Sequence, residues 1–332
     1  MRQERALPRF RAGAGERDLG AEAINLALLA AAATGVQVGA AIVASRFAVG
    51  EVPPLTLAML RYAIGFCCLL PFAWPALAVP ARDQRAPVAG SRALDLLAMA
   101  ALGIGQFGVL IALLNFGLQH IGAAQAALIF SLFPLLTLLL SAALGRERIT
   151  PSLVLGVLIS IAGVALALAP KLGASQAGHW WGELAVAAAA CTGALCSVLY
   201  KPFLQRYPTI PVSAFAMLAS VLFLALLALG EHWPARVGSF SGQSWAAVTF
   251  IGVSSGIGYF WWLYALKHES PTRVTVFLAL NPLTAALLGW MLLGEALHPA
   301  ALGALVLIAA GLWLATRPAN GRVRGGLIDS QR

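Results

Sequence analysis

The sequence predicts an all-α integral membrane protein with ten transmembrane helices, arranged as an inverted-topology repeat of two five-helix modules. Three observations support this fold class. The chain has 332 residues, of which 60% are hydrophobic and only 11% charged, and its mean hydropathy is +0.83, whereas soluble domains carry about 25% charged residues. Apolar segments long enough to span a bilayer follow one another along the chain. Landmarks of the first half also recur in the second half.

Each expected helix rests on the length of one apolar segment. A span needs about 20 mostly apolar residues, because an α-helix rises about 1.5 Å per residue and the hydrocarbon core is about 30 Å thick. Backbone polar groups must be paired inside lipid, so we expect helices and not open strands. Proline near the start of several segments agrees with helix starts. The expected spans are 23–44, 55–75, 94–117, 122–144, 151–169, 181–201, 211–229, 245–266, 271–294 and 299–316.

Uncommon residues repeat between the two halves at a constant shift of 148 residues, without a gap. Such self-similarity indicates a duplicated unit. Because each unit holds five helices, an odd number, the two units must enter the membrane from opposite sides, as in the inverted repeats of many secondary transporters. The matched pairs are His120 with His268, Pro134 with Pro282, Glu147 with Glu295, Pro151 with Pro299, and Gly163 with Gly311.

The distribution of Lys and Arg predicts the orientation. With the N-terminus inside, 18 of the 22 Lys and Arg residues lie in or next to inner segments, and only Arg46, Lys171 and Arg236 lie in outer connections. This bias follows the positive-inside rule and places both termini in the cytoplasm. The expected organisation is a disordered cytoplasmic tail at 1–22, a first module at 23–169, a linker at 170–180, a second module at 181–316 and a cytoplasmic tail at 317–332.

Several function classes are excluded by what the sequence lacks. A net charge of +9 would suggest a nucleic-acid partner in a soluble protein, but these basic residues lie in short connections and no base-reading fold signature accompanies them. No P-loop, nucleophile elbow, dinucleotide fingerprint, diphosphate site or metal-ligand cluster can be recognised. We therefore expect no nucleic-acid partner, no enzymatic activity, no metal and no cofactor.

Short motifs spread over about residues 23–316 carry a family resemblance. The first half holds Pro54-Leu55-Thr56 with Arg61, and Leu144 to Pro151 with Gly156 and Gly163; the second holds Gly182-Glu183-Leu184, Asn281-Pro282, Gly294-Glu295 and Pro299. In this combination the chain resembles the drug/metabolite transporter superfamily, specifically its ten-helix, twin-module, EamA-type branch. The resemblance implies export of small metabolites, often amino acids or related compounds, from a bacterial inner membrane. The family commonly has tryptophan where this chain has Thr34 and Thr192.

Neutral polar side chains near the middle of the expected helices are the candidate binding residues. An amide that faces lipid would cost several kcal/mol, so Gln37, Gln106 and Asn281 must face other helices or a wet cavity. Hydrogen bonding between helices is the alternative role for every member of the set. The candidates are Thr34, Gln37, Gln106, Ser131, Thr192, Ser254, Ser255 and Asn281.

The segment 245–266 is rich in aromatic residues. Tyr259 lies one helical turn after Ser255, and we expect it to line the cavity and to suit aromatic or apolar cargo. Trp261, Trp262 and Tyr264 lie nearer the end of the segment and are expected in an interfacial aromatic belt.

Ionisable residues inside membrane segments usually mark ion or proton pathways. All the acidic residues of this chain lie in tails, connections or helix ends. We therefore expect no proton relay, unless Glu22, Asp95 or Glu183 lies deeper than its position suggests. The cargo is then neutral or zwitterionic, or aromatic, and uncoupled uniport is an open alternative to coupled transport.

Pro134 and Pro282 occupy matching mid-helix positions. Each removes a helical hydrogen bond, freeing the carbonyl of Phe130 or Leu278, and bends its helix. They are candidate hinges for alternating access, and a static kink re-satisfied by neighbouring groups is the alternative.

Arg61 lies about 9 Å below the expected outer surface, counted as six residues of helix. Three roles are open for it: snorkelling to the surface, pairing with Glu51, or attracting a substrate carboxylate in an outer vestibule. Glu147 and Glu295 are expected to cap the helices that follow them.

Together these features predict a secondary transporter. It exports small metabolites (amino acids or related neutral, zwitterionic or aromatic compounds) by alternating access across the bacterial inner membrane, as a multi-pass protein with both termini cytoplasmic. The expected partners are a small-molecule substrate, the lipid bilayer and a second copy in a homodimer. The alternatives are an importer or exchanger of nucleoside- or sugar-type solutes, and a non-transporting membrane scaffold or sensor.

Overall fold

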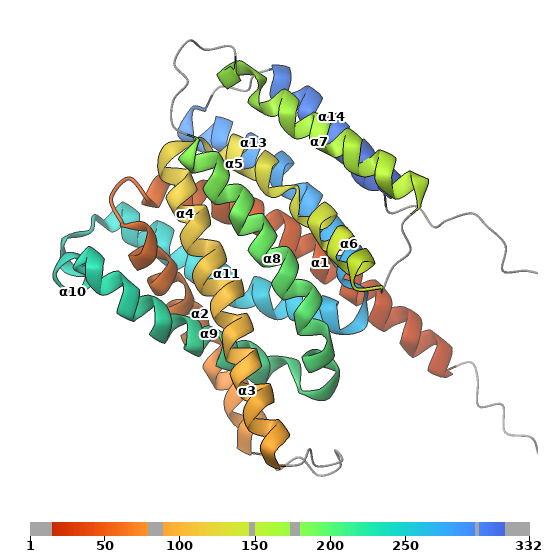
Figure 1. Cartoon of the computed structure of the whole chain (residues 1–332). Coiled ribbons are helices and arrows are strands. Elements are labelled where there is room, and N and C mark those ends of the chain that lie inside the picture. The colour runs from red at the N-terminus through yellow and green to blue at the C-terminus, as the bar shows by residue number, and fades with distance from the viewer. Residues whose placement is uncertain (1–14, 79–88, 146–149, 173–179, 296–298, 316–332) are drawn as a thin grey trace, which may run out of the picture.

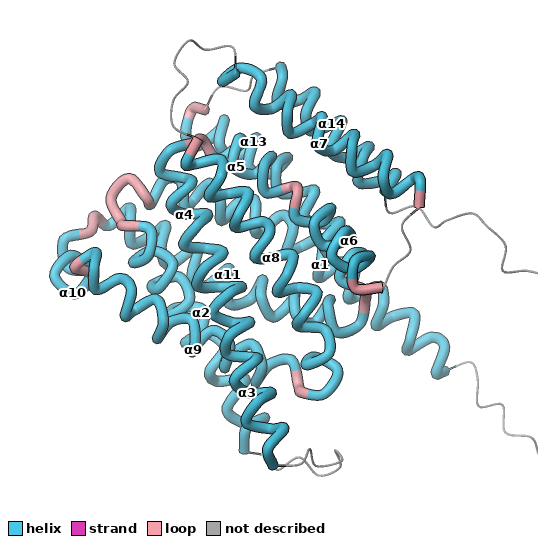
Figure 2. The backbone as a smooth tube through the Cα atoms, viewed as in Figure 1, coloured by secondary structure: helices cyan, strands magenta, loops and turns pink. Residues whose placement is uncertain are grey.

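The computed structural model describes residues 15–78, 89–145, 150–172, 180–295 and 299–315, and within them every regular element is a helix (Figures 1 and 2). The all-helical prediction is confirmed for this part of the chain. The α-helices are α1 (Gly15–Ala48), α2 (Pro54–Ala78), α3 (Ala89–Gly103), α4 (Leu110–His120), α5 (Ala123–Phe130), α6 (Phe133–Ala143), α7 (Pro151–Leu172), α8 (Trp181–Arg206), α9 (Thr209–Leu227), α10 (Trp233–Arg236), α11 (Gly242–His268), α12 (Pro271–Val276), α13 (Leu280–Leu293) and α14 (Pro299–Ala315).

Three of the expected spans each consist of two α-helices joined by a short non-α-helical segment. α3 continues into α4 through a π-helical turn, Ile104–Val109, and α12 continues into α13 through a 3-10 turn, Phe277–Ala279. α5 and α6 are separated by Ser131 and Leu132. Each pair belongs to one apolar run, Ala93–His120, Ala123–Ala143 or Arg273–Leu293, and fills the place of one predicted span.

Eight helical runs among the described residues are long and apolar enough to cross a membrane. Two shorter apolar helices, Val154–Leu166 and Pro299–Leu314, stand where the fifth and tenth spans were expected. The chain is therefore a multi-pass membrane protein. The eight long runs are Leu26–Ala48, Pro54–Phe72, Ala93–His120, Ala123–Ala143, Trp181–Arg206, Thr209–Glu231, Gly242–His268 and Arg273–Leu293.

α7 and α14 pack side by side along one edge of the bundle (Figure 1). A Cβ atom on Gly311 would lie 2.5 Å from the Gly156 carbonyl oxygen, and one on Gly163 would lie 3.0 Å from that of Ala304. Small residues let helices approach closely in a membrane, where apolar side chains gain little by leaving lipid. Gly163 and Gly311 are a matched pair of the repeat, and each contacts the helix that carries the other.

Pro134 and Pro282 each lie in the first turn of a helix that follows an interruption. Pro134 is the second residue of α6, and Pro282 is the third residue of α13. The first N–H groups of a helix have no acceptor within it, so proline is tolerated there. The structure thus has divided helices at the two places where bent ones were expected.

Glycine ends the two helices that these prolines begin. Gly145 follows α6 with a φ angle of +68°, and Gly294 follows α13 with a φ angle of +65°. Glycine adopts this left-handed conformation without the strain of a Cβ atom and is common just past a helix end. Both α6 and α13 therefore have a proline in the first turn and a left-handed glycine just past the end.

Glu295 caps a helix in the other half of the chain, and not the helix that follows it. Its carboxylate accepts the N–H groups of Ala123 at 3.0 Å and Ala124 at 3.4 Å, at the start of α5. Unpaired N–H groups and the helix dipole make a carboxylate stabilising at that position. The expected cap on α14 is replaced by a contact between the halves, and Glu147 lies outside the described residues.

Glu51 makes a similar cap at the start of α11. Its carboxylate accepts the N–H and hydroxyl groups of Ser241, both at 2.6 Å, and the hydroxyl of Ser244. Hydrogen bonds from Ser241 and then Ser244 lower the pKa of Glu51 below its ordinary value of 4.5. The Glu51 carboxylate therefore ties the connection after α1 to the start of α11.

This lowered pKa predicts a pH-dependent contribution to stability. The folded state favours the ionised carboxylate, so its contribution is complete above the ordinary pKa of 4.5 and is lost as the pH falls through the lower folded-state pKa. We expect Glu51→Gln to lower the melting temperature of the detergent-solubilised protein at pH 7. The gap to wild type should close in acid, and a gap that stays constant down to pH 3 would contradict the assignment.

Candidate functional site

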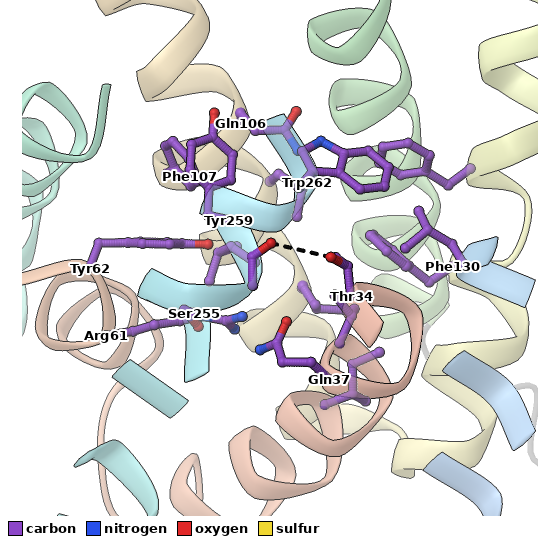
Figure 3. Close-up of a pocket in the computed structure, with 18 residues that line it drawn as sticks. Thr34, Gln37, Arg61, Tyr62, Gln106, Phe107, Phe130, Ser255, Tyr259 and Trp262 are labelled. Carbon is purple, nitrogen blue, oxygen red and sulfur yellow. Dashed lines mark hydrogen bonds between the residues drawn. The ribbon is translucent and has the colours of Figure 1, made fainter. Parts of the chain in front are cut away.

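A cavity lies inside the bundle, between helices from both halves of the chain (Figure 3). Its volume is about 80 Å³. One buried water needs about 10–15 Å³ of such space. The first half contributes residues from α1, α2, α4, α5, α6 and the turn Ile104–Val109, and the second half contributes residues from α11 and Leu278. The cavity can hold several waters or the polar group of a solute.

Six of the residues predicted from the sequence line this cavity. They come from four helical segments, so that the fold brings together positions up to 225 residues apart, such as Thr34 and Tyr259. The six are Thr34, Gln37, Arg61, Gln106, Ser255 and Tyr259.

Ser254, whose hydroxyl accepts a hydrogen bond from Gln37, lies outside the lining, and so do three further candidates. The hydroxyls of Ser131 and Thr192 donate to carbonyls of their own chain segments, Leu128 at 2.5 Å and Ala188 at 2.9 Å. These hydroxyls need no other partner. Asn281 is completely buried, and its amide has no hydrogen-bond partner among the described residues. The structure therefore does not bring these three side chains to the cavity.

Thr34 and Gln37 connect α1 with α11 at the edge of the cavity. The Thr34 hydroxyl lies 2.8 Å from the carbonyl oxygen of Ala30 and 3.3 Å from that of Gly258, and the Gln37 amide nitrogen donates to Ser254 at 3.2 Å. A Cβ atom on Gly258 would lie 2.4 Å from the Gln37 amide oxygen. Glycine at position 258 thus leaves room for the Gln37 side chain.

Gln106 and Phe107 enter the cavity from the π-helical turn Ile104–Val109. Successive residues of an α-helix point about 100° apart, and the wider π turn changes which side chains share a face. The Gln106 amide oxygen is buried and has no hydrogen-bond partner among the described residues. An acceptor with no protein donor at the wall of a cavity can receive a hydrogen bond from water or from a ligand.

Arg61 is buried inside the bundle, with only 5% of its surface exposed. Its Nε atom donates to the Ser255 hydroxyl oxygen at 2.6 Å, and Ser255 in turn donates to the carbonyl of Ile251. Glu51 is held by Ser241 and Ser244. Of the three roles open for Arg61, neither snorkelling nor pairing with Glu51 is found, and the side chain lines the cavity.

Aromatic rings form much of the remaining wall. The Phe107 ring lies 4.7 Å from that of Tyr62 and 4.0 Å from that of Tyr259, measured between centroids. On the other side the Phe133 ring lies 6.0 Å from that of Trp262, with an interplanar angle of 83°. Such tilted and edge-to-face pairs are favourable arrangements. Figure 3 shows the rings of Tyr62, Phe107, Tyr259 and Trp262 together with the polar side chains of the lining.

Sequence reasoning missed several of these aromatic residues. Trp262 was expected in an interfacial belt, but it is 5% exposed and lines the cavity. Its spacing holds the missed signal, because Ser255, Tyr259 and Trp262 follow at intervals of four and three residues, which place them on one helix face. The other aromatic lining residues that were not predicted are Tyr62, Phe107, Phe130 and Phe133.

Acidic side chains do not line this cavity among the described residues. Glu183 is buried at the start of α8, where the Gln125 amide donates to it at 3.1 Å, and Asp95 accepts the Tyr207 hydroxyl at 2.9 Å. In the same part of the chain, no group of three or more His, Cys, Asp or Glu side chains could hold a metal ion. The polar chemistry of the cavity therefore comes from one guanidinium, two amides and hydroxyl groups.

Comparison with known proteins gives a family. A profile of the EamA-like transporter family matches residues 25–169 and 180–317, once in each half of the chain. A solved crystal structure with 26% sequence identity aligns with a TM-score of 0.63, covering 89% of this chain and 96% of the other.

Three curated relatives add to this match. A protein of Archaeoglobus fulgidus named only as an uncharacterized transporter is 28% identical, over 84% of this chain and 94% of its own. A probable terminal-alkyne amino-acid exporter of Streptantibioticus cattleyicolor is 31% identical, over 73% and 80%. The aromatic amino acid exporter YddG of Ancylobacter novellus is 31% identical, over 50% of this chain and 57% of its own.

Proposed function

Because the chain belongs to the EamA-like transporter family, in the drug/metabolite transporter superfamily, we propose that it exports small metabolites across a bacterial inner membrane by alternating access. Its family members are named as transporters and exporters, so the chain is a membrane transporter and not an enzyme. The proposed cargo is an amino acid or a related neutral, zwitterionic or aromatic compound.

The cavity between the two halves is the observation that carries this proposal. Its polar groups include Gln37 and Gln106 amides, and its aromatic rings include Phe107 and Tyr259. Solute sites of secondary transporters lie near the membrane midplane, between repeats. A pocket with a few polar groups and an aromatic wall can orient a solute that has one polar and one apolar end. Two relatives named as amino-acid exporters agree with that class of cargo.

The proposed architecture is ten spans in two oppositely inserted five-helix modules. The helix contacts support it, because each contact recurs when the halves are exchanged. α1 packs against α11 and α13, and α8, its counterpart, packs against α4 and α6. α2 packs against α9, and α7 against α14, so these counterparts contact each other directly. α7 and α14 then serve as the fifth and tenth spans, and both termini lie in the cytoplasm.

Flux in proteoliposomes tests the proposed function. The purified full-length protein should move radiolabelled amino acids faster than protein-free vesicles do, in measurements with and without a pH gradient. Stimulation by the gradient would indicate proton coupling, and equal rates would indicate uniport. Movement of only nucleosides or sugars would favour the alternative cargo. No flux with any member of the panel would favour a scaffold or sensor.

The interruptions before Pro134 and Pro282 are proposed hinges between the open and closed states. Proline keeps each helix from extending backward into a continuous rod. We expect Pro134→Ala and Pro282→Ala to slow turnover by roughly three- to ten-fold, equivalent to about 1 kcal/mol in the barrier, because hinge residues control conformational steps. Initial-rate flux and equilibrium binding of the same solute distinguish a slower conformational step from weaker solute binding. We expect slower flux with unchanged binding. Unchanged flux would mean that Pro134 and Pro282 shape the helices but do not act as hinges.

The predicted homodimer can be checked with the same preparation. Large apolar side chains on α13 and α14 face outward in the single chain, among them Trp290, Met291, Val306 and Trp313. These side chains could contact lipid, or they could contact a second copy of the chain in a dimer. The mass of the protein in nanodiscs distinguishes a monomer from a dimer.

A further inference from the structure

We infer that Arg61 and Ser255 form a carboxylate-binding subsite, so that the cargo of this transporter carries a carboxylate group next to an aromatic or apolar body. The inference rests on the proposed function and narrows its class of solute. It depends on the surroundings of one buried cation and on the wall that faces it.

The Arg61 guanidinium is a buried charge without a counter-ion among the described residues. Only 5% of the residue is exposed, and among the described residues no carboxylate lies within ion-pair distance of it. Its printed contacts are the 2.6 Å hydrogen bond from Nε to Ser255 and the neighbouring Tyr62 ring, whose centroid is 5.4 Å away. A charge in a membrane interior is expensive unless it pairs or lines a wet cavity, and such residues are commonly functional.

The hydrogen bond to Ser255 orients the guanidinium and leaves its outer edge available. Nε donates to Ser255, and the terminal NH₂ groups make no hydrogen bond or ion pair with the described part of the chain. Figure 3 shows Arg61 and Gln37 extending toward one another from α2 and α1. A planar guanidinium with free N–H groups binds a carboxylate through two parallel hydrogen bonds, which an ammonium group cannot do.

The charge balance of the cavity favours a carboxylate over a phosphate. Arg61 is the one cationic residue in the described lining, and no anionic residue faces it. A single carboxylate neutralises that charge, whereas a phosphate dianion would leave an excess negative charge in a region of low dielectric. The Gln106 amide oxygen, which lacks a donor, can accept a hydrogen bond from an amino group of the same solute. An amino acid and a simple aryl or alkyl carboxylate both carry the carboxylate that the Arg61 guanidinium would bind.

A matched solute series tests the inference. L-Phenylalanine, 3-phenylpropanoate, L-phenylalanine amide and phenethylamine share one aromatic body, and only the first two carry a carboxylate. In wild-type proteoliposomes we expect the two carboxylates to be moved, and to compete with each other, at least about ten-fold better than the other two, since charge-assisted hydrogen bonds are the strong ones. Arg61→Gln should abolish this preference, and Arg61→Lys should retain part of it because the charge remains without the planar fork.

Two further variants serve as controls in case Arg61→Gln prevents folding. If Arg61→Gln does not yield folded protein, Ser255→Ala and the wild-type selectivity still report on the subsite: Ser255→Ala should lower carboxylate flux while Thr137→Ala, a buried hydroxyl outside the cavity, should not. Equal flux of phenylalanine and its amide in wild type would overturn the inference while leaving transport intact. Transport of other solutes without any carboxylate would do the same. A wild-type protein that moves no solute at all would instead overturn the proposed function.

Discussion

Replacing Gln37 or Gln106 by alanine is expected to lower solute flux by about ten-fold or more. Each amide lines the cavity, and Gln106 presents an oxygen with no protein donor among the described residues. Losing one hydrogen bond to a polar solute in a desolvated site costs about 1–3 kcal/mol, and 1.4 kcal/mol is a factor of ten. The readout is initial flux in proteoliposomes, divided by the amount of protein incorporated.

Gln205→Ala is the matched control for these two variants. Gln205 lies near the end of α8, is exposed, and donates its amide to the Lys267 carbonyl at 3.0 Å. The same substitution there removes an exposed amide that does not line the cavity. We therefore expect flux to stay within two-fold of wild type, which corresponds to about 0.4 kcal/mol. Unchanged flux in folded Gln37→Ala and Gln106→Ala would refute the site assignment.

Gly35→Ala is expected to have the largest effect on folding. A Cβ atom on Gly35 would lie 2.2 Å from the backbone carbonyl oxygen of Phe277, and a backbone atom cannot turn aside as a side chain can. Overpacking of this kind costs typically about 1–3 kcal/mol. We expect a lower melting temperature and less monodisperse protein in mild detergent.

Two further glycines make this prediction specific. Gly230→Ala is the neutral control, because an added Cβ there meets nothing within 4 Å. A Cβ atom on Gly193, which follows Thr192 as Gly35 follows Thr34, would lie 2.0 Å from the Phe133 ring, which can move but lines the cavity. Gly193→Ala should therefore impair flux more than stability. Equal melting temperatures for Gly35→Ala and Gly230→Ala would contradict the close contact of α1 with Phe277–Ala279.

The coarse fold could be predicted because its causes are local. Segment length and apolar composition determine where helices can cross lipid, and the starts at Pro54, Pro151, Pro271 and Pro299 agree with the structure. The interruptions at Ser131 and at Phe277–Ala279 depend on which side chains each helix meets across the bundle. Periodicity carries no information on that packing, so bent helices were expected where divided ones are found.

The candidate site could be predicted in its polar part and not in its aromatic part. A polar side chain in an apolar segment is unusual and must find a partner, which singled out Gln37 and Gln106. Aromatic residues are common in membrane helices, so Phe107 and Phe133 carried no comparable signal. The π turn at Ile104–Val109 could not be expected either, since it changes the helical phase on which face assignments depend.

We propose that two five-helix modules, inserted in opposite directions, enclose the polar cavity where they meet. Alkaline phosphatase and green fluorescent protein fusions, each placed at the C-terminus and after residue 176 in the expected linker, test it most directly. Opposite insertion of the two modules predicts a cytoplasmic C-terminus, where only the fluorescent fusion is active, and a periplasmic linker, where only the phosphatase fusion is active. Finding both positions on the same side of the membrane would mean that the second module does not contain an odd number of spans, and the inverted repeat would be excluded.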